Sequence, residues 1–158
     1  MSKCKWNPSN ICTSAIQFFG DERIQAVINK DSRTAYVGFG SADLAWVHKL
    51  LKKGFHHCYT FYDYMGGVLR VEYLYNKIEV TFVEKKIEDY IKIVKRNNTR
   101  IIETNIKTDK ILCSNWPTIN PPNCVSLTKN NLGVKLKRTW TPWQLFNNLL
   151  KHTNSKEI

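Results

Sequence analysis

The sequence has no apolar run approaching the ~18 residues that a membrane-spanning helix needs, so no membrane span is expected. The first ten residues, MSKCKWNPSN, contain no apolar segment of the kind that begins a secretory signal. Internal repeats and low-complexity segments are also missing. The 158 residues, 42% of them hydrophobic, instead predict a single globular domain over 1–158. Within it we expect an irregular leader over 1–13 and a frayed tail over 153–158.

Metal ligands at the usual short spacings are absent too, because the chain has no CxxC and no HxxxH pattern. His56, Cys58 and Cys113 could converge on a metal, but without such spacing a zinc site is the least favoured interpretation, and no metal or other cofactor is expected. The odd number of cysteines, with no signal segment, favours free thiols in a reducing compartment. The five cysteines are Cys4, Cys12, Cys58, Cys113 and Cys124.

Acidic residues are scarce: 13 Asp and Glu stand against 24 Lys and Arg, which gives a net charge of +11. Such an excess favours an anionic partner such as nucleic acid. The basic residues that could contact it are Lys95, Arg96, Lys135, Lys137 and Arg138, and stacking on bases would come from Trp116, Trp140 and Trp143. We rank nucleic-acid binding lower than the alternatives below, because basic surfaces often only keep a protein soluble and a helix would bury Trp143.

The apolar periodicity predicts an α+β fold, with an antiparallel sheet of about four to six strands and helices packed against it. Strands are predicted over Thr34–Phe39, Phe55–Tyr62, Val68–Tyr75, Ile78–Glu84 and Thr99–Thr108. Helices are predicted over Ala42–Lys53, Ile87–Asn97, Cys124–Leu132 and from Pro142 to about His152. Less regular signals predict one or two short, loosely helical elements in Ser14–Asn29 and an extended segment over Val134–Thr139.

Turn and cap residues mark several boundaries. Asp63–Gly67 is predicted to be a hairpin loop in which Gly66 and Gly67 supply positive φ. Asn123 is predicted to cap the helix that Gly133 ends. Thr141, Pro142 and Gln144 match a capping box with proline at the first helical position.

Cys124 is the leading nucleophile candidate, because it would begin a helix. Free backbone N–H groups and the helix dipole stabilise a thiolate at such a position, and they could also hold an oxyanion. Asn123 would serve as the cap or as part of this oxyanion site. The alternative is that Cys124 is a small, inert, buried residue.

His57 is the leading base, since strand alternation groups it with Phe55, Tyr59 and Phe61 on one face. His56 is the competitor and would point to the opposite face, so only one of the two imidazoles can meet Cys124. Glu72, on the neighbouring strand, could accept a hydrogen bond from the imidazole and fix its tautomer. The alternative for Glu72 is an ordinary same-face pair with Arg70, and Glu79 would then be the substitute carboxylate.

Four segments together resemble a known family: YVGFG, GFHHC, NCVSLTKNNLGV and TPWQLF. The combination is similar to small tailed-phage proteins related to circularly permuted NlpC/P60 (papain-like) cysteine hydrolases, over roughly Tyr36 to Leu150. The resemblance implies a histidine strand that precedes the cysteine helix, with Cys124 as nucleophile, His57 as base and Glu72 as polar third member. It also implies metal-free cleavage or transfer of amide or ester bonds, in the cytoplasm of an infected bacterial host or in a virion.

Three hypotheses follow. The first is a thiol-dependent hydrolase or acyltransferase that acts on a peptide, a peptidoglycan-type amide or another acyl substrate such as a lipid ester. The second is a non-enzymatic phage protein on the same fold, either a virion component or a protein that binds a host protein. The third is the nucleic-acid-binding domain described above. A Cys124 thiol that reacts faster than the other four would separate the first hypothesis from the others.

Overall fold

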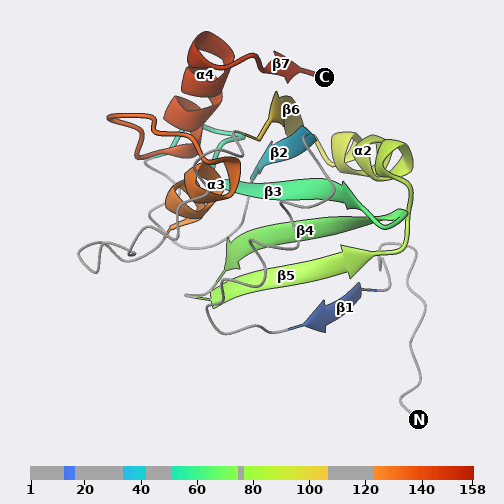
Figure 1. Cartoon of the computed structure of the whole chain (residues 1–158). Coiled ribbons are helices and arrows are strands. Elements are labelled where there is room, and N and C mark those ends of the chain that lie inside the picture. Colours follow the sequence, from blue (N-terminus) through green and yellow to red (C-terminus); the bar gives the residue numbers. More distant parts are fainter. Residues whose placement is uncertain (1–12, 17–33, 42–50, 75–76, 107–122) are drawn as a thin grey trace.

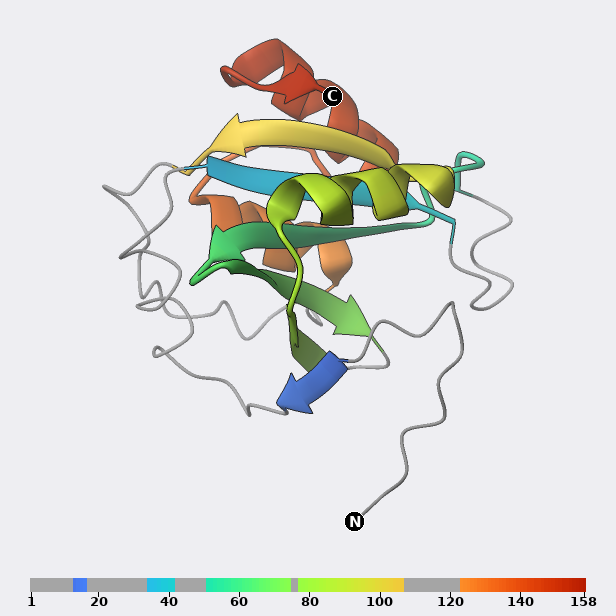
Figure 2. The ribbon, with the colours of Figure 1, turned by 90° about the vertical axis from the view of Figure 1, so that its right-hand side faces the viewer.

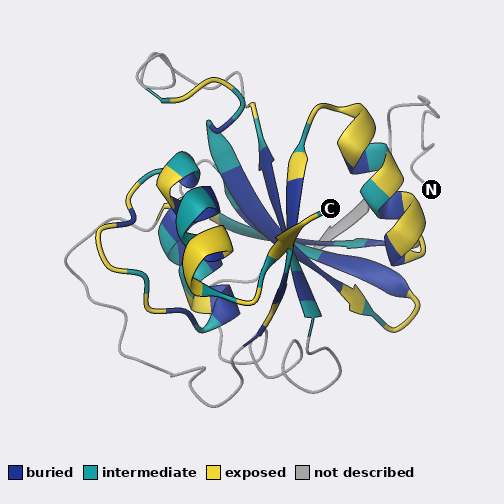
Figure 3. Cartoon of the chain, turned by 90° about the horizontal axis from the view of Figure 1, so that it is seen from above, coloured by how far each residue is buried: buried dark blue, intermediate teal, exposed yellow. Residues whose placement is uncertain are grey.

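A seven-stranded antiparallel sheet forms the centre of the computed structural model, which describes residues 13–16, 34–41, 51–74, 77–106 and 123–158 (Figure 1). The strand order is β1-β5-β4-β3-β2-β6-β7. The sheet is strongly twisted, as the view from above shows (Figure 3). The strands are β1 (Thr13–Ile16), β2 (Thr34–Gly40), β3 (His57–Tyr64), β4 (Gly67–Leu74), β5 (Lys77–Val83), β6 (Arg100–Asn105) and β7 (Lys156–Glu157).

Helices cover both faces of this sheet (Figure 2). On one face α2 (Ile87–Arg96) packs over a core that includes Tyr59 and Phe61 of β3. On the other face α3 (Cys124–Leu132) and α4 (Pro142–His152) pack over a core that includes Cys58 and Tyr62. The predicted α+β class, with helices against an antiparallel sheet, is therefore confirmed. The alternation predicted for β3 also holds from His57 to Tyr62, whereas Phe55 precedes the strand and packs in the α3–α4 core.

The local signals for the last two helices are confirmed in detail. The Asn123 side chain accepts a hydrogen bond from the Ser126 amide at 2.8 Å, and Gly133 ends α3 with a φ of 63°. Thr141 and Gln144 form the predicted capping box at the start of α4. Both helix starts are thus determined by short-range hydrogen bonds that the sequence encodes directly.

The hairpin between β3 and β4 is tighter than predicted. The strands extend to Tyr64 and from Gly67, so the loop is only Met65 and Gly66, with φ values of 48° and 77°. Gly67 does not supply positive φ. It is needed because a Cβ there would lie 2.3 Å from Cζ of Phe82 on β5. The expected five-residue loop is therefore wrong, and cross-strand packing explains the second glycine.

The expected frayed tail is also wrong. β7 pairs with β6, and Arg100 binds the Glu157 carboxylate through Nε at 2.6 Å and through its terminal nitrogen at 2.7 Å. Ser155 donates to Thr104 at 2.6 Å. Backbone pairing and a bidentate ion pair hold these last residues on the edge of the sheet.

Two other predictions fall partly outside the described residues, and a third, inside them, is wrong. For the helix predicted over Ala42–Lys53, residues 42–50 are not described, and residues 51–53 are not helical. Thr13–Ile16 is a strand rather than the start of a loosely helical element. The segment Val134–Thr139 forms no strand, and Arg138 has a φ of 53°, so the expected extended conformation is wrong there.

Candidate functional site: a thiol, an imidazole and a carboxylate

β3 and β4 separate at the end of the sheet where β3 begins. Their ladder runs from Tyr64↔Gly67 and ends at Thr60↔Val71. The neighbouring ladders continue further, β2–β3 to Gly40↔His57 and β4–β5 to Leu74↔Lys77. Of these three ladders, the one between β3 and β4 therefore ends first, and the residues beyond it do not pair across the two strands.

The start of α3 occupies this position. Figure 1 shows α3 beside the beginning of β3 and the end of β4, and α3 contacts both strands. The helix is held there by a short polar chain, in which the Asn131 amide donates to Thr60 Oγ1 at 2.8 Å and Thr60 Oγ1 donates to the Val71 carbonyl at 3.3 Å. All three partners are buried, so these bonds fix α3 against the two strands where their ladder ends.

Cys124 is the first residue of α3, as predicted, and is partly exposed. Its sulfur lies within reach of the Cys58 thiol, the His57 side chain and the Cys58 backbone N–H, and all three influence its pKa. The Cys58 thiol has the largest influence and lowers the pKa of Cys124. Burial raises this pKa, and His57 lowers it further. The net result is that the pKa of the Cys124 thiol falls from 9.0 to about 4. The N-terminus of α3 also favours negative charge at this sulfur.

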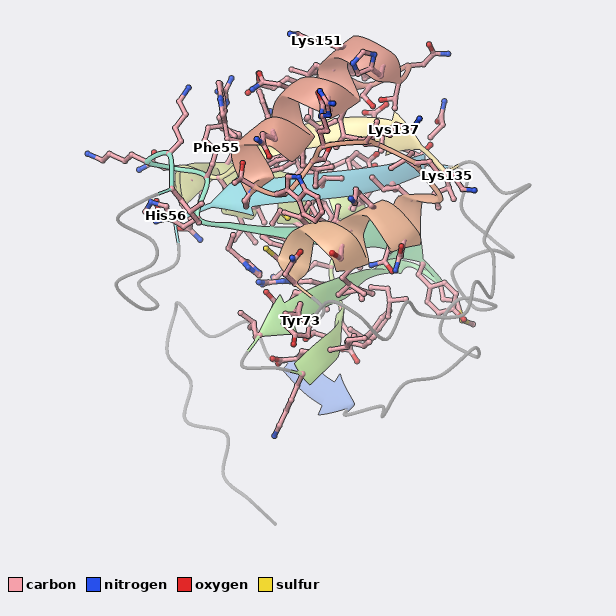
Figure 4. All side chains as sticks on the ribbon, turned by 90° about the vertical axis from the view of Figure 1, so that its left-hand side faces the viewer. Phe55, His56, Tyr73, Lys135, Lys137 and Lys151 are labelled. Carbon is pink, nitrogen blue, oxygen red and sulfur yellow. The ribbon has the colours of Figure 1, made fainter. Side chains whose placement is uncertain are left out.

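His57 is the imidazole that the structure brings to Cys124. Burial disfavours its charged form, but hydrogen bonds to Cys124 and Glu72 outweigh burial and raise the pKa of His57 to about 9. Its side chain is 14% exposed. A lowered thiol pKa beside a raised imidazole pKa favours a thiolate–imidazolium pair at neutral pH. His56, the competitor, lies directly before β3, where its amide donates to the Gly40 carbonyl at 3.0 Å (Figure 4).

Glu72 completes the arrangement. Its Oε2 lies 3.3 Å from His57 Nε2 and also accepts a hydrogen bond from Arg70 at 2.6 Å. Burial favours the protonated acid, yet the His57 hydrogen bond and the Arg70 charge keep the pKa of Glu72 below its ordinary value. The Oε2 atom of Glu72 therefore makes both of the contacts considered from the sequence, one with His57 and one with Arg70. Glu79 lies opposite Glu72 on β5, and Glu72 is the carboxylate that His57 contacts.

Tyr59 supports the other side of this arrangement, which the sequence did not indicate. The His57 ring stacks on Tyr59 with a centroid distance of 6.2 Å, and the Arg70 guanidinium lies 4.1 Å from the centre of the same ring. The Tyr59 ring in turn lies over Gly38 of β2, where a Cβ would come within 2.5 Å of Cζ. Gly38, the central residue of YVGFG, thus leaves room for the Tyr59 ring, which contacts both His57 and Arg70.

Cys58 is part of this site, whereas sequence reasoning considered it only as a possible metal ligand. Alternation places it on the face opposite His57, where it is fully buried. Because Cys124 lies where β3 and β4 have separated, its sulfur reaches both His57 and Cys58 from the edge of β3. The adjacent HHC letters were the available signal, but only the end of the ladder makes two opposite-facing neighbours converge.

The basic residues proposed for nucleic acid lie on two different faces. Lys95 and Arg96 end α2 on one face of the sheet, whereas Lys135, Lys137 and Arg138 lie in the α3–α4 connection on the other (Figure 4). Trp140 is 66% exposed, but Trp143 stacks on Phe146 and carries the Lys52 ammonium 3.1 Å above its ring. Trp116 lies outside the described residues.

Two further properties concern the described residues only. Within 13–16, 34–41, 51–74, 77–106 and 123–158, no three His, Cys, Asp or Glu side chains are placed to share a metal ion, and Cys113 falls outside these ranges. None of the helices in the same ranges has the length and apolar character needed to cross a membrane.

Comparison of the chain with protein-family models, with curated proteins and with solved structures finds no match in any of the three.

Proposed function

We propose that this protein is a thiol-dependent hydrolase or acyltransferase that acts on an amide or ester bond through Cys124. The observation that carries the proposal is the placement of His57 between the Cys124 sulfur, whose pKa it lowers, and Glu72, whose Oε2 lies 3.3 Å from His57 Nε2. A partly exposed thiol at a helix start, a base in contact with it and a third group that orients the base are the parts of an activated nucleophile.

The chemistry follows from these contacts. The Cys124 thiolate attacks the substrate carbonyl carbon, and the carbonyl oxygen becomes an oxyanion that backbone N–H groups at the start of α3 would hold. The His57 imidazolium then gives its proton to the leaving amine or alcohol, which leaves an acyl thioester on Cys124. Neutral His57 next takes a proton from water, or from an acceptor nucleophile, which attacks the thioester and releases the acyl group with the Cys124 thiolate.

Glu72 has a positioning role in this scheme. With Nε2 of His57 directed at Glu72, Nδ1 is the ring nitrogen that remains for exchange with sulfur and substrate. Arg70 shares the same carboxylate oxygen and so keeps Glu72 ionised while it accepts from His57. The carboxylate thereby holds one orientation of the ring and stabilises its charged form.

The order of the elements supports the resemblance to permuted NlpC/P60 hydrolases. The strand that carries His57 precedes the helix that begins with Cys124, and the carboxylate lies on the strand that follows His57. On this basis we propose a peptide, peptidoglycan-type amide or lipid ester as the substrate class. We retain a role in a phage-infected bacterium or a virion as part of the same proposal.

The test uses p-nitrophenyl acetate with the full chain in a Cys4→Ser, Cys12→Ser, Cys113→Ser background, so that only the two described thiols remain. We expect a burst of p-nitrophenol equal to the protein concentration and one acetyl group on Cys124, both lost in Cys124→Ala. His57→Gln should slow the burst by about 10²-fold or more, the usual contribution of a general acid–base group. Acetylation of Cys124 at the rate of an unactivated thiol would contradict the proposal.

A further inference from the structure

The two cysteines of the site form a second feature that acyl transfer does not explain. Cys58 has no exposed surface, and Thr128 Oγ1 donates to its sulfur at 3.6 Å. Thr128 lies four residues after Cys124 in α3, so the two residues share one face of the helix. Two independent contacts therefore place the Cys58 sulfur against this face, the bond to Thr128 and the hydrogen bond to Cys124.

The contacts of these two thiols differ in a way that gives each a distinct role. Thr128 donates to the Cys58 sulfur, which leaves the Cys58 S–H available to donate to Cys124. Cys124 is partly exposed, whereas Cys58 is fully enclosed, so a small reagent from solvent meets Cys124 first. A thiolate that solvent can reach, with a second thiol in contact behind it, is the arrangement in which a sulfenic acid is converted to a disulfide.

We propose that Cys124 and Cys58 act together on small hydroperoxides, with Cys124 as the thiol that is oxidised and Cys58 as the thiol that resolves it. The Cys124 thiolate attacks the terminal peroxide oxygen and becomes a sulfenic acid, while the O–O bond breaks and the leaving oxygen takes a proton from His57 to give an alcohol or water. The Cys58 sulfur then attacks the Cys124 sulfur, and a disulfide forms with loss of water. The sulfurs lose two electrons in total, and the peroxide gains them.

This inference rests on the thiolate of the proposed function but not on acyl transfer itself. Formation of the disulfide removes the nucleophile reversibly, because a dithiol reductant restores both thiols. Without Cys58 the sulfenic acid would be exposed to more peroxide and would pass to the irreversible sulfinic acid. Cys58 would therefore protect an activated cysteine whose reactivity makes it prone to oxidation.

The test protein is the chain in which Cys4, Cys12 and Cys113 are replaced by serine. It is treated with hydrogen peroxide, and its intact mass and peptide map are measured before and after the treatment. We expect the mass to fall by two hydrogen atoms, a map that links the Cys58 and Cys124 peptides, and full recovery with dithiothreitol. In Cys58→Ala the same treatment should instead add two oxygen atoms to Cys124, and dithiothreitol should not remove them. In Cys124→Ala no oxidation of Cys58 is expected, because Cys58 is buried.

The inference is overturned if the chain that keeps both thiols gains oxygen at Cys124 as fast as Cys58→Ala does, or if no peptide linking Cys58 and Cys124 forms. The first of these readouts compares two proteins, and the second needs only the chain with both thiols, so a Cys58 variant that fails to fold does not prevent a decision. Disulfide formation in a chain that shows no burst with p-nitrophenyl acetate would contradict acyl transfer and leave the dithiol chemistry standing.

Discussion

His57 Nε2 and Glu72 Oε2 lie 3.3 Å apart across two strands whose backbone ladder has already ended. The side chains thus make a connection between β3 and β4 where the main chains make none. At the same point the amide of Cys58 turns to the sulfur of Cys124. The separation of the two strands is therefore what allows a helix start, an imidazole and a carboxylate to meet.

Replacement of Glu72 by glutamine is the first prediction. The amide cannot stabilise an imidazolium as the carboxylate does, so the pKa of His57 should fall from about 9 and the alkaline limit of activity should move to lower pH. We expect turnover of p-nitrophenyl acetate to fall by about tenfold or more. The control is Glu79→Gln, which removes a carboxylate opposite Glu72 on β5 that His57 does not contact. An equal loss in both variants would argue against an orienting role for Glu72.

The second prediction concerns the pH dependence of alkylation at Cys124. The thiolate exists above its lowered pKa of about 4, and the imidazolium persists until its raised pKa of about 9. Iodoacetamide should therefore label Cys124 at a nearly constant rate between these pH values, whereas an ordinary thiol reacts slowly until near pH 8.5. Peptide mapping after short pulses would measure the rate at each pH. A rate that rises steadily from pH 6 to pH 9 would show that the thiolate is not stabilised.

The third prediction concerns the effect of the Cys124 thiolate and the His57 imidazolium on the free energy of unfolding. Between pH 4 and pH 6.5 the unfolded chain holds a proton on Cys124 that the folded chain has lost, so the free energy of unfolding rises with pH. Between pH 6.5 and pH 9 the folded chain keeps a proton on His57 that the unfolded chain has lost, so the two effects cancel.

The measurement is urea unfolding at several pH values, with the result for Cys124→Ser subtracted from that of the unchanged protein. The difference should increase by at most about 1.4 kcal/mol per pH unit over the lower interval, because a single proton is linked to unfolding. A difference independent of pH would mean that the folded Cys124 thiol titrates as it does in the unfolded chain.

The sequence predicted those parts of the site that depend on neighbouring residues. Asn123 and Gly133 bound α3 through local hydrogen bonds and a left-handed C-terminal residue, so Cys124 could be placed at a helix start. The short hairpin made β3 and β4 neighbours, so Glu72 could be paired with His57. Local chemistry and short connections were sufficient for these three residues.

The remaining features depend on contacts between distant segments. The end of the β3–β4 ladder, and with it the contact between Cys58 and Cys124, appears only when α3 has packed on the sheet. The register that places Gly38 opposite Tyr59 is likewise a property of the assembled β2–β3 pair. The C-terminal residues are held on the sheet by the ion pair between Glu157 and Arg100, which is distant in the sequence. Periodicity contains no information on such pairs.

Gly38→Ala is the fourth prediction. The new Cβ would lie 2.5 Å from Cζ of Tyr59, so the ring that stacks on His57 must move, and overpacking of this kind costs about 1–3 kcal/mol. The free energy of unfolding and the p-nitrophenyl acetate burst should both decrease. Gly40→Ala is the matched control on the same strand, since its Cβ would meet Thr99 Oγ1 at an ordinary 3.4 Å. If the two variants behave alike, the Gly38 requirement does not arise from the Tyr59 ring.

The fifth prediction separates two effects of the α3 N-cap, its effect on the reactivity of Cys124 and its effect on stability. Asn123→Ala removes the bond to the Ser126 amide, and Thr141→Ala removes the equivalent bond to the Gln144 amide at the start of α4. Each should cost about 1 kcal/mol in urea unfolding, a typical value for a lost N-cap. Only Asn123→Ala disturbs the turn that presents Cys124, so only this variant should slow iodoacetamide labelling of Cys124 at pH 6. Equal labelling rates in the two variants would mean that the α3 cap does not help to hold the thiolate.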